Sequence, residues 1–252
     1  MSAQAEAIDQ DMGEHIGLRI AVGSLPRGSK ITDIAALKVA NWIPNSKRTV
    51  ILMGWATYSK LQTFKRFGID PAALYAAHLL VTPVHVSPAA RTTSPLIVTV
   101  TEVDTPVGTS AWNEITKNKL DAIVVDPVTG GFHMLNGRST SSDPAWCWIC
   151  YRRVYDKIRT DLFNGFQFIK SEPSTAALDT VVQDTANNYL QGLLYDKVLA
   201  GFDPAVSNDN NNPPAIRAAG KRYVDIGIEL IPPNDFTQFN LNRVLRGSIR
   251  LA

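Results

Sequence analysis

Three groups of residues in this chain have types and spacings that could do chemistry. The first is the segment from Gly23 to Lys30, GSLPRGSK, which follows a strand-like run and precedes a helix-like one. A phosphate-binding loop has this placement, but it needs Lys directly after its second Gly and a hydroxyl residue after that Lys. Here Ser29 comes first and Lys30 second. We therefore interpret the segment as a turn, and we keep a nucleotide-binding α/β enzyme as the alternative function.

The second and third groups are the cysteines and the histidines. Cys147 and Cys150 have the spacing of a redox or zinc half-site, but no second pair exists. In a strand, residues three apart lie on opposite faces, and a buried free Cys behaves as a small hydrophobic residue. The histidines have no metal-ligand spacing: they are His15, His78, His85 and His133. The sequence thus predicts no catalytic residue, cofactor or metal, and a protein that is not an enzyme.

Composition bounds the class of protein. The chain has 252 residues, of which 45% are hydrophobic, a mean hydropathy of -0.05 and a formal net charge of +2. This is enough for a sizeable core, and it is not the strongly basic balance of a nucleic-acid binder. No apolar run reaches eighteen residues and the start of the chain is acidic, so we expect no membrane partner and no export signal. Two cysteines fit synthesis in a reducing cytoplasm.

Alternating strand-like and helix-like segments predict a mixed α/β (α+β) fold. Strands are expected where short apolar runs occur, over 49–55, 74–86, 96–103 and 122–125. Helices are expected where apolar residues recur at helical spacing, over 31–42, 112–120, 151–165 and about 175–200, the last with Gly201 as its C-cap. Asn208 to Pro214 is predicted to be a surface loop.

Both ends of the chain carry strand-like arms. Apolar residues alternate with others in each, and the face near the C-terminus also alternates with Arg246, Ser248 and Arg250. A terminal strand with one apolar face is an aggregation hazard unless another chain completes the sheet, although pairing within its own chain is the simpler alternative. The apolar arm residues are Ile16, Leu18, Ile20 and Val22, then Phe239, Leu241, Leu245, Ile249 and Leu251.

Six short motifs follow one another in the second half of the chain. Ser141 to Trp146 reads SSDPAW, and Arg152-Arg153-Val154-Tyr155 follows it into a helix-like run. The remaining motifs are QFIKSEP at 167–173, the leucine-rich helix before Gly201, NPP at 212–214, the strand over 222–232 and an apolar run over 236–244. In this order the motifs resemble those of contractile-tail sheath proteins, and Arg138 stands near the place of an arginine in that family.

The resemblance implies a sheath-type core with flanking helices over 29–236, between an N-terminal arm over 1–28 and a C-terminal arm over 237–252. Each arm would insert beside the core sheet of a neighbouring subunit. The accepting strand would carry Val224, Ile226, Ile228 and Leu230. Without the large outer insertions of many sheath proteins, this chain would be a minimal sheath.

The resemblance also implies function and partners. Stacked hexameric rings would surround a tail tube and contract to drive it through the envelope of the target cell. The partners would be the chain itself, the tail tube protein, and the baseplate and tail terminator proteins. Arg152, Arg153 or Lys197 would face the tube. The location would be the tail of a bacteriophage virion assembled in the host cytoplasm; a bacterial contractile injection system, or a tube or baseplate component, are the alternatives.

Overall fold

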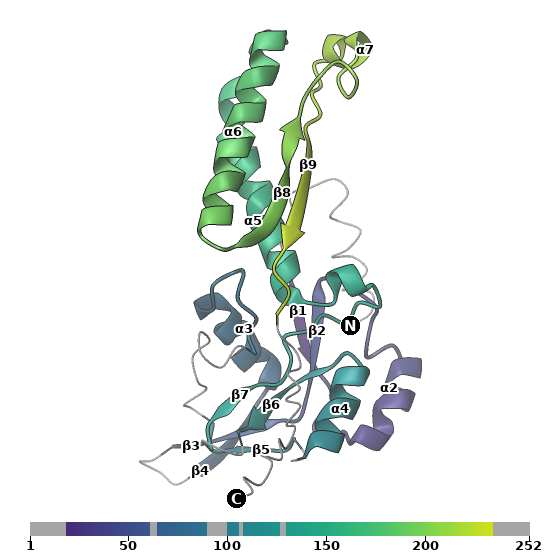
Figure 1. The fold of residues 1–252 in the computed structure, drawn as a ribbon. Coiled ribbons are helices and arrows are strands. Elements are labelled where there is room, and N and C mark those ends of the chain that lie inside the picture. The colour runs from purple at the N-terminus through teal and green to yellow at the C-terminus, as the bar shows by residue number, and fades with distance from the viewer. Residues whose placement is uncertain (1–18, 61–64, 90–99, 106–107, 127–129, 234–252) are drawn as a thin grey trace, which may run out of the picture.

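The computed structural model describes residues 19–60, 65–89, 100–105, 108–126 and 130–233. They form two lobes (Figure 1). We call residues 19–148, which hold most of the strands, the sheet lobe, and residues 149–233, which form two long helices and a hairpin, the helical lobe. Within the described residues, no helix is long and apolar enough to cross a lipid bilayer.

A four-stranded sheet forms the centre of the sheet lobe. Its order is β1 (Ala21–Ser24), β2 (Thr49–Met53), β6 (Asp121–Val125) and β7 (Phe132–Met134). The first three strands are parallel and β7 is antiparallel to β6. All five residues of β2 are buried, as expected for a parallel strand with helices on both faces.

Alternate residues of these strands supply two cores. Val50, Leu52 and Ile123 pack with α3 (Pro71–Val81) on one face of the sheet. Ile51, Met53 and Val124 pack on the other face with the second core, to which the short helices η1 (Ile31–Asp33) and α2 (Ile34–Val39) and the helix α4 (Thr109–Lys117) contribute. Because successive side chains of a strand point to opposite faces, one buried strand joins both cores.

A small antiparallel sheet lies below the main one in Figure 1. Its order is β4 (Lys65–Ile69), β3 (Ala56–Lys60) and β5 (Glu102–Val103). Ala56 and Val103 connect this sheet to the core under α3. The sheet therefore extends the lobe without forming a core of its own.

The helical lobe begins where a 3-10 turn, η2 (Pro144–Trp146), leads into α5 (Ile149–Gly165). A second 3-10 turn, η3 (Gln167–Ile169), returns the chain to α6 (Ala176–Tyr195). The hairpin strands β8 (Leu199–Val206) and β9 (Asp225–Leu230) then pack on these helices, with α7 (Pro214–Ala218) at the tip between them. α5 extends away from the sheet lobe, so it joins the two lobes (Figure 1).

Most of the predicted elements are confirmed. β2, β6 and β9 lie within or beside their predicted ranges, as do the helices over 31–39, 109–117 and 149–165. The mixed α/β class is confirmed for the described residues. The sequence did not reveal β3, β4, β7, β8 or α7.

The predicted strand over 74–86 is wrong, because this segment forms α3. The Asp70 side chain accepts the Ala72 backbone N–H at 2.9 Å, and Pro71 occupies the first turn, which together start a helix. Tyr75 and Leu79 are buried, whereas Leu80 is 87% exposed. An unbroken apolar run hides this helical periodicity from sequence analysis.

The predicted end of the long second helix is also wrong. α6 stops at Tyr195, Lys197 takes a positive φ of 57°, and Gly201 lies in β8 instead of capping the helix. Val198 and Leu199 still pack in the same core as the helix leucines, so the apolar spacing continues through the turn. The QFIKSEP segment, compared with a strand end, forms a 3-10 turn.

Candidate assembly interface

The β8–β9 hairpin is a two-stranded antiparallel sheet with one covered face. Phe202 pairs with Ile228, and both pack in the core that α5 and α6 form with Leu190, Leu193 and Leu199. Two side chains of α6 also form hydrogen bonds with the main chain at the end of β8. The Asn187 side chain accepts the Ala205 N–H at 2.8 Å, and the Gln183 side chain donates to the Ser207 carbonyl at 2.7 Å. The hairpin is therefore fixed on the helices.

Neither strand of this hairpin pairs with a third strand among the described residues. Its outer edges carry backbone N–H and C=O groups, which are a template for an added strand. The last part of β8 is the exception, because Pro204 has no N–H, the Ala205 N–H is bound by Asn187 and the Val206 carbonyl is bound by Asn211. Of the predicted accepting residues, Ile226, Ile228 and Leu230 pack inward against the helices. Val224 lies just before β9. Their side chains thus hold the hairpin in place, and the backbone edge is the part left to accept another strand.

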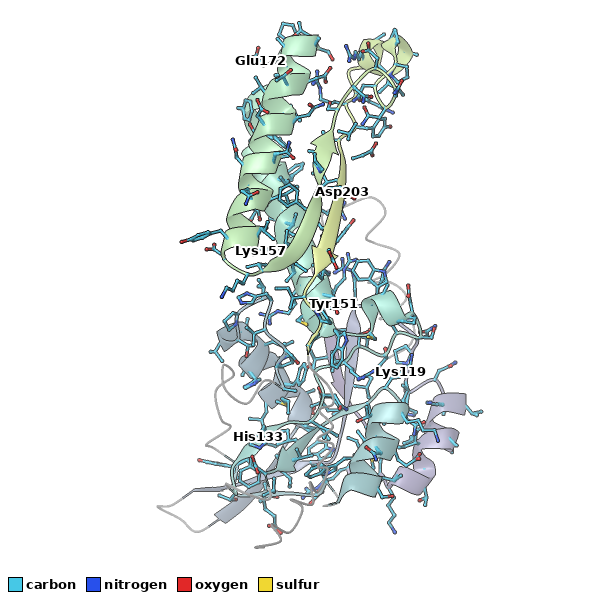
Figure 2. All side chains as sticks on the ribbon, viewed as in Figure 1. Lys119, His133, Tyr151, Lys157, Glu172 and Asp203 are labelled. Carbon is cyan, nitrogen blue, oxygen red and sulfur yellow. The ribbon has the colours of Figure 1, made fainter. Side chains whose placement is uncertain are left out.

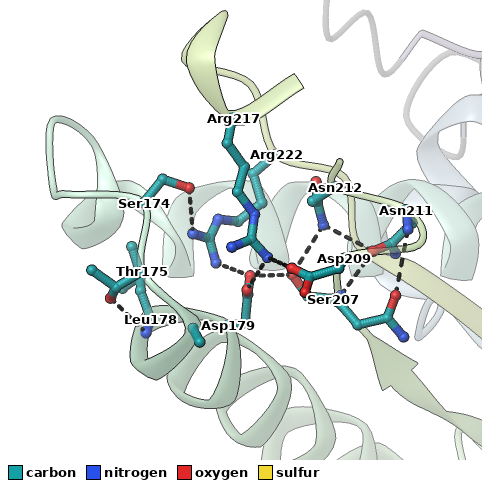
Figure 3. A network of polar contacts seen from close by, with 12 residues as sticks. Ser174, Thr175, Leu178, Asp179, Ser207, Asp209, Asn211, Asn212, Arg217 and Arg222 are labelled. Carbon is teal, nitrogen blue, oxygen red and sulfur yellow. Dashed lines mark hydrogen bonds and ion pairs between the residues drawn. The ribbon is translucent and has the colours of Figure 1, made fainter. Parts of the chain in front are cut away.

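A polar network fixes the tip of the hairpin to α6 (Figure 3). The buried carboxylate of Asp179 accepts hydrogen bonds from Arg217 at 2.7 Å, from Ser207 at 2.8 Å and from Arg222. Arg222 also donates to the Ser174 hydroxyl at 3.0 Å, before the start of α6. Hydrogen bonds to charged groups are among the stronger ones, so this network determines where the chain turns.

Asn212 completes the tip. Its side chain accepts the Tyr223 N–H at 2.6 Å and donates to the Tyr223 carbonyl at 2.8 Å, and it is only 1% exposed. Composition predicted a surface loop here, and the loop contains this buried residue at its base. The NPP motif at 212–214 was the available signal, because Pro214 starts α7.

A buried ion cluster joins the two lobes. Arg48, at the start of β2, donates to both carboxylate oxygens of Asp156 in α5, at 2.6 and 2.8 Å. Arg152 lies 2.9 Å from the same carboxylate. Burial raises the pKa of Asp156, while the hydrogen bonds and charge of Arg48 act to lower it. The cluster fixes the direction in which α5 leaves the sheet lobe.

The structure gives two of the three predicted tube-facing residues roles inside the chain. Arg152 is 5% exposed and stacks against the rings of Trp146 and Tyr155. Arg153 donates to the Leu79 carbonyl at 2.7 Å and the Thr82 carbonyl at 2.8 Å, where α3 ends and its carbonyls lack helical partners. Lys197 is exposed on the turn between α6 and β8, so the tube-facing hypothesis is kept for Lys197 alone.

The described part of the N-terminal arm lies in its own chain. Val22 is in β1, which pairs with β2, and Ile20 packs beside it against the core under α3. Ile16 and Leu18 lie outside the described residues, as do all the predicted residues of the C-terminal arm: Phe239, Leu241, Leu245, Ile249 and Leu251. Ile20 and Val22 are therefore already packed or paired within their own chain.

The Gly23–Lys30 segment borders a cavity of about 410 Å³ beyond the carboxyl ends of β1 and β2. Ligands of parallel sheets bind at such ends. However, the Lys30 N–H already donates to the Asp33 carboxylate at 2.9 Å. The Asp33 carboxylate accepts hydrogen bonds from the Lys30 N–H and the Thr32 hydroxyl, which lower its pKa, so this N–H is already bound and is not open to a phosphate. The geometry does not favour a nucleotide site.

The cysteines lie at the start of a helix, and the strand considered for them is wrong. Ile149 begins α5, so Cys150 is helical, and neither Cys147 nor Cys150 forms a disulfide. Burial raises the pKa of Cys150 to about 12, which keeps it as an unreactive thiol at neutral pH. Among the described residues, no cluster of His, Cys, Asp or Glu could hold a metal ion.

Comparisons with known proteins agree with this architecture. A chain of the anti-feeding prophage (AFP) baseplate is similar with a TM-score of 0.74 and 18% identity, over 97% of this chain and 64% of that one. The contracted PVC sheath of an extracellular contractile injection system is similar with a TM-score of 0.74 and 18% identity, over 88% of this chain and 63% of that one. The sheath tail protein of Desulfitobacterium hafniense is similar with a TM-score of 0.59 and 12% identity, over 83% of this chain and 46% of that one.

This chain thus spans less than two thirds of the length of each of these proteins. No protein-family model matches it, and no curated protein sequence does. At such low identity the comparisons bear on the fold, and they confirm the resemblance at that level. The chain has the fold of the contractile sheath proteins.

Proposed function

We propose that this chain is a structural subunit of a contractile sheath, and not an enzyme. The observation that carries the proposal is the β8–β9 hairpin, a sheet fixed on α5 and α6 by its inner face and open at its edges among the described residues. A two-stranded sheet gains stability when further strands are added. Strands from neighbouring subunits would supply them.

The terminal segments are the strands that we propose for this role. Ile16 and Leu18 before Ile20 alternate with other side chains, and so do Leu245, Ile249 and Leu251 within the arm from about Phe239 to Leu251. Each would lie along an edge of the hairpin in a neighbouring copy, with its apolar side chains toward α5 and α6. Covalently continuous arms of this kind would keep subunits linked while stacked hexameric rings slide and turn.

The assembled sheath would surround a tail tube, contract without nucleotide and drive the tube through the target envelope. Contraction would be a change between two packings of the same subunits. Further partners would be baseplate and tail terminator proteins, and Lys197 on the exposed turn after α6 would contact the tube. The similarity to AFP and PVC chains supports an injection system, whereas a bacteriophage virion tail remains the other setting for the same device.

A second candidate function is a subunit at the baseplate end of the sheath. The similarity to a chain of the AFP baseplate favours it. Such a subunit would stop at one ring, whereas a subunit of the sheath body would stack into tubes.

Electron microscopy of the purified full chain tests these alternatives. We expect tubes or stacked rings, and their loss in a variant that lacks residues 1–18, which leaves Ile20 and Val22 in the core. A variant that lacks residues 1–8, before the apolar alternation, is the matched control and should still assemble. Single rings would favour the baseplate position, and a monomer at every concentration would contradict the sheath proposal.

A further inference from the structure

The outer face of the hairpin, opposite α5 and α6, is acidic. Asp203 is paired with Gly227 and Gly201 with Glu229 in the register of β8 and β9, while Phe202 and Ile228 between them point inward. Both carboxylate residues are exposed, and Figure 2 shows Asp203 on the hairpin of the helical lobe. We call the surface formed by these two pairs the acidic face.

The two glycines leave room for the carboxylates on this face. A Cβ atom at Gly227 would lie 2.4 Å from an Asp203 carboxylate oxygen, and one at Gly201 would lie 3.1 Å from a Glu229 carboxylate oxygen. Each carboxylate therefore lies over the strand opposite its own. Side chains at these two positions would displace both carboxylates from the centre of the sheet.

No cation neutralises the acidic face within the described residues. β8 and β9 contain no Lys or Arg, and neither Asp203 nor Glu229 takes part in an ion pair or side-chain hydrogen bond there. Two exposed carboxylates beside an open sheet edge repel acidic strands and attract basic ones. The partner that this surface fits is thus an added strand with cations on its outer face.

The last residues of the chain have this pattern. Arg246, Ser248 and Arg250 alternate with Leu245, Ile249 and Leu251, and residues 234–252 contain three arginines and one aspartate. In a strand along the hairpin edge, the leucines and Ile249 would cover the core and the two arginines would lie on the acidic face. Adjacent strands are about 4.8 Å apart, and diagonal neighbours about 7–8 Å apart remain within reach of long side chains.

We infer that Asp203 and Glu229 recognise Arg246 and Arg250 of a second copy of this chain, and thereby set the register of the exchanged C-terminal strand. The inference rests on the proposed sheath function. A slip by one residue turns every side chain to the other face. Such a slip would turn Arg246 and Arg250 toward α5 and α6 and expose Leu245, Ile249 and Leu251, so charge and hydrophobicity favour the same register for residues 245–251.

Charge reversal of full-length chains tests this recognition. The face variant carries Asp203→Lys and Glu229→Lys, and the tail variant carries Arg246→Glu and Arg250→Glu. We expect each variant alone to form at least tenfold less sedimentable assembly than the wild-type chain. Its thermal unfolding midpoint should be unchanged. An equimolar mixture should recover assembly, because the face of each variant then meets the tail of the other.

The control variant has Glu172→Lys and Asp184→Lys, an equal change of charge at exposed positions of the same lobe. It should assemble like the wild type, and an equal loss would attribute the effect to net charge and overturn the inference. If assembly recovers in a chain with all four reversals but not in the mixture of the two variants, the tail binds its own hairpin, and the inference is overturned. Wild-type assembly together with normal assembly of the face variant would refute the inference and leave the sheath function standing. Failure of the wild type to assemble would contradict both.

Discussion

β2 and β9 are the main strands of their lobes, but they differ in the number of strands that pair with them and in their burial. β2 lies between β1 and β6, has helices on both faces and is buried at all five residues. Among the described residues, β9 has one partner strand, helices on one face and no fully buried residue. In the sheet lobe, β2 has a hydrogen-bonded partner strand of the same chain on each side. In the helical lobe, each hairpin strand has one edge without a partner strand among the described residues. Under the proposed function, the first kind of sheet would stabilise the subunit and the second would link it to its neighbours.

The largest expected effect comes from breaking the connection between the lobes. Asp156→Ala removes the carboxylate that Arg48 and Arg152 share and leaves two buried cations without an anion. Loss of one partner from a buried ion pair costs about 3–5 kcal/mol. Urea unfolding should show this decrease in the free energy of unfolding. Lys157→Ala, on the exposed side of the same helix, should cost less than about 1 kcal/mol, and equal losses would refute the lobe-joining role.

The next effect concerns the sheet lobe. The fully buried carboxylate of Asp121 accepts backbone N–H groups of Ala122 at 2.8 Å, Asn136 at 3.0 Å and Gly137 at 2.7 Å. Asp121→Asn places an NH2 group against one of these donors, which should cost about 2–3 kcal/mol. Denaturant unfolding measures the loss. An unchanged midpoint would show that the loop over 135–138 does not depend on this carboxylate.

The helical lobe should respond more locally. Asp179→Ala releases Arg217, Arg222 and Ser207 at the tip, and we expect about 2 kcal/mol of local stability to be lost there. Hydrogen exchange should accelerate over 207–223 and remain unchanged in β2. Asp184→Ala, an exposed position on the same helix, is the control. Acceleration that extends equally to β2 would show that the two lobes unfold together, against the comparison made above.

The smallest effect is a pH-dependent one between α5 and α6. Burial acts to raise the pKa of Asp161, but hydrogen bonds from Lys157 at 2.7 Å and Tyr189 at 2.6 Å lower it overall. A folded-state pKa below the unfolded value of about 3.8 adds stability above that pH, and this stability is lost as the pH falls through the folded pKa. Asp161→Asn should therefore cost up to about 1 kcal/mol at pH 7 and nothing near pH 2.

Urea unfolding of the wild type and of Asp161→Asn at both pH values checks this prediction. Tyr189→Phe keeps the carboxylate and removes one hydrogen bond, so it should cost less at pH 7. A difference of the same size at pH 2 as at pH 7 would show that the carboxylate charge is not the cause.

Periodicity determined much of the fold from the sequence. The buried run of β2, the alternation of β9 and the amphipathic spacing of α5 were each visible locally, because apolar residues mark the side of an element that faces a core, or both sides in β2. The strand assigned to the α3 segment failed because an apolar run has no visible period, and the extended end of α6 failed because Val198 and Leu199 keep the helical spacing beyond the turn. To distinguish a helix from a strand in the α3 segment, or to place the end of α6, one must know which parts of the chain pack against each side of the segment.

The candidate interface divides in the same way. The sequence by itself determined which segments are strand-like, including Val224–Leu230 and the alternation of arginines with leucine and isoleucine near the C-terminus. Only the tertiary structure decided that Arg152 and Arg153 bind groups in their own chain, that Ile20 and Val22 pack in their own chain, and that Asp203 and Glu229 share one face of the hairpin. Partner choice depends on contacts between residues distant in sequence, and these form only when the lobes have packed.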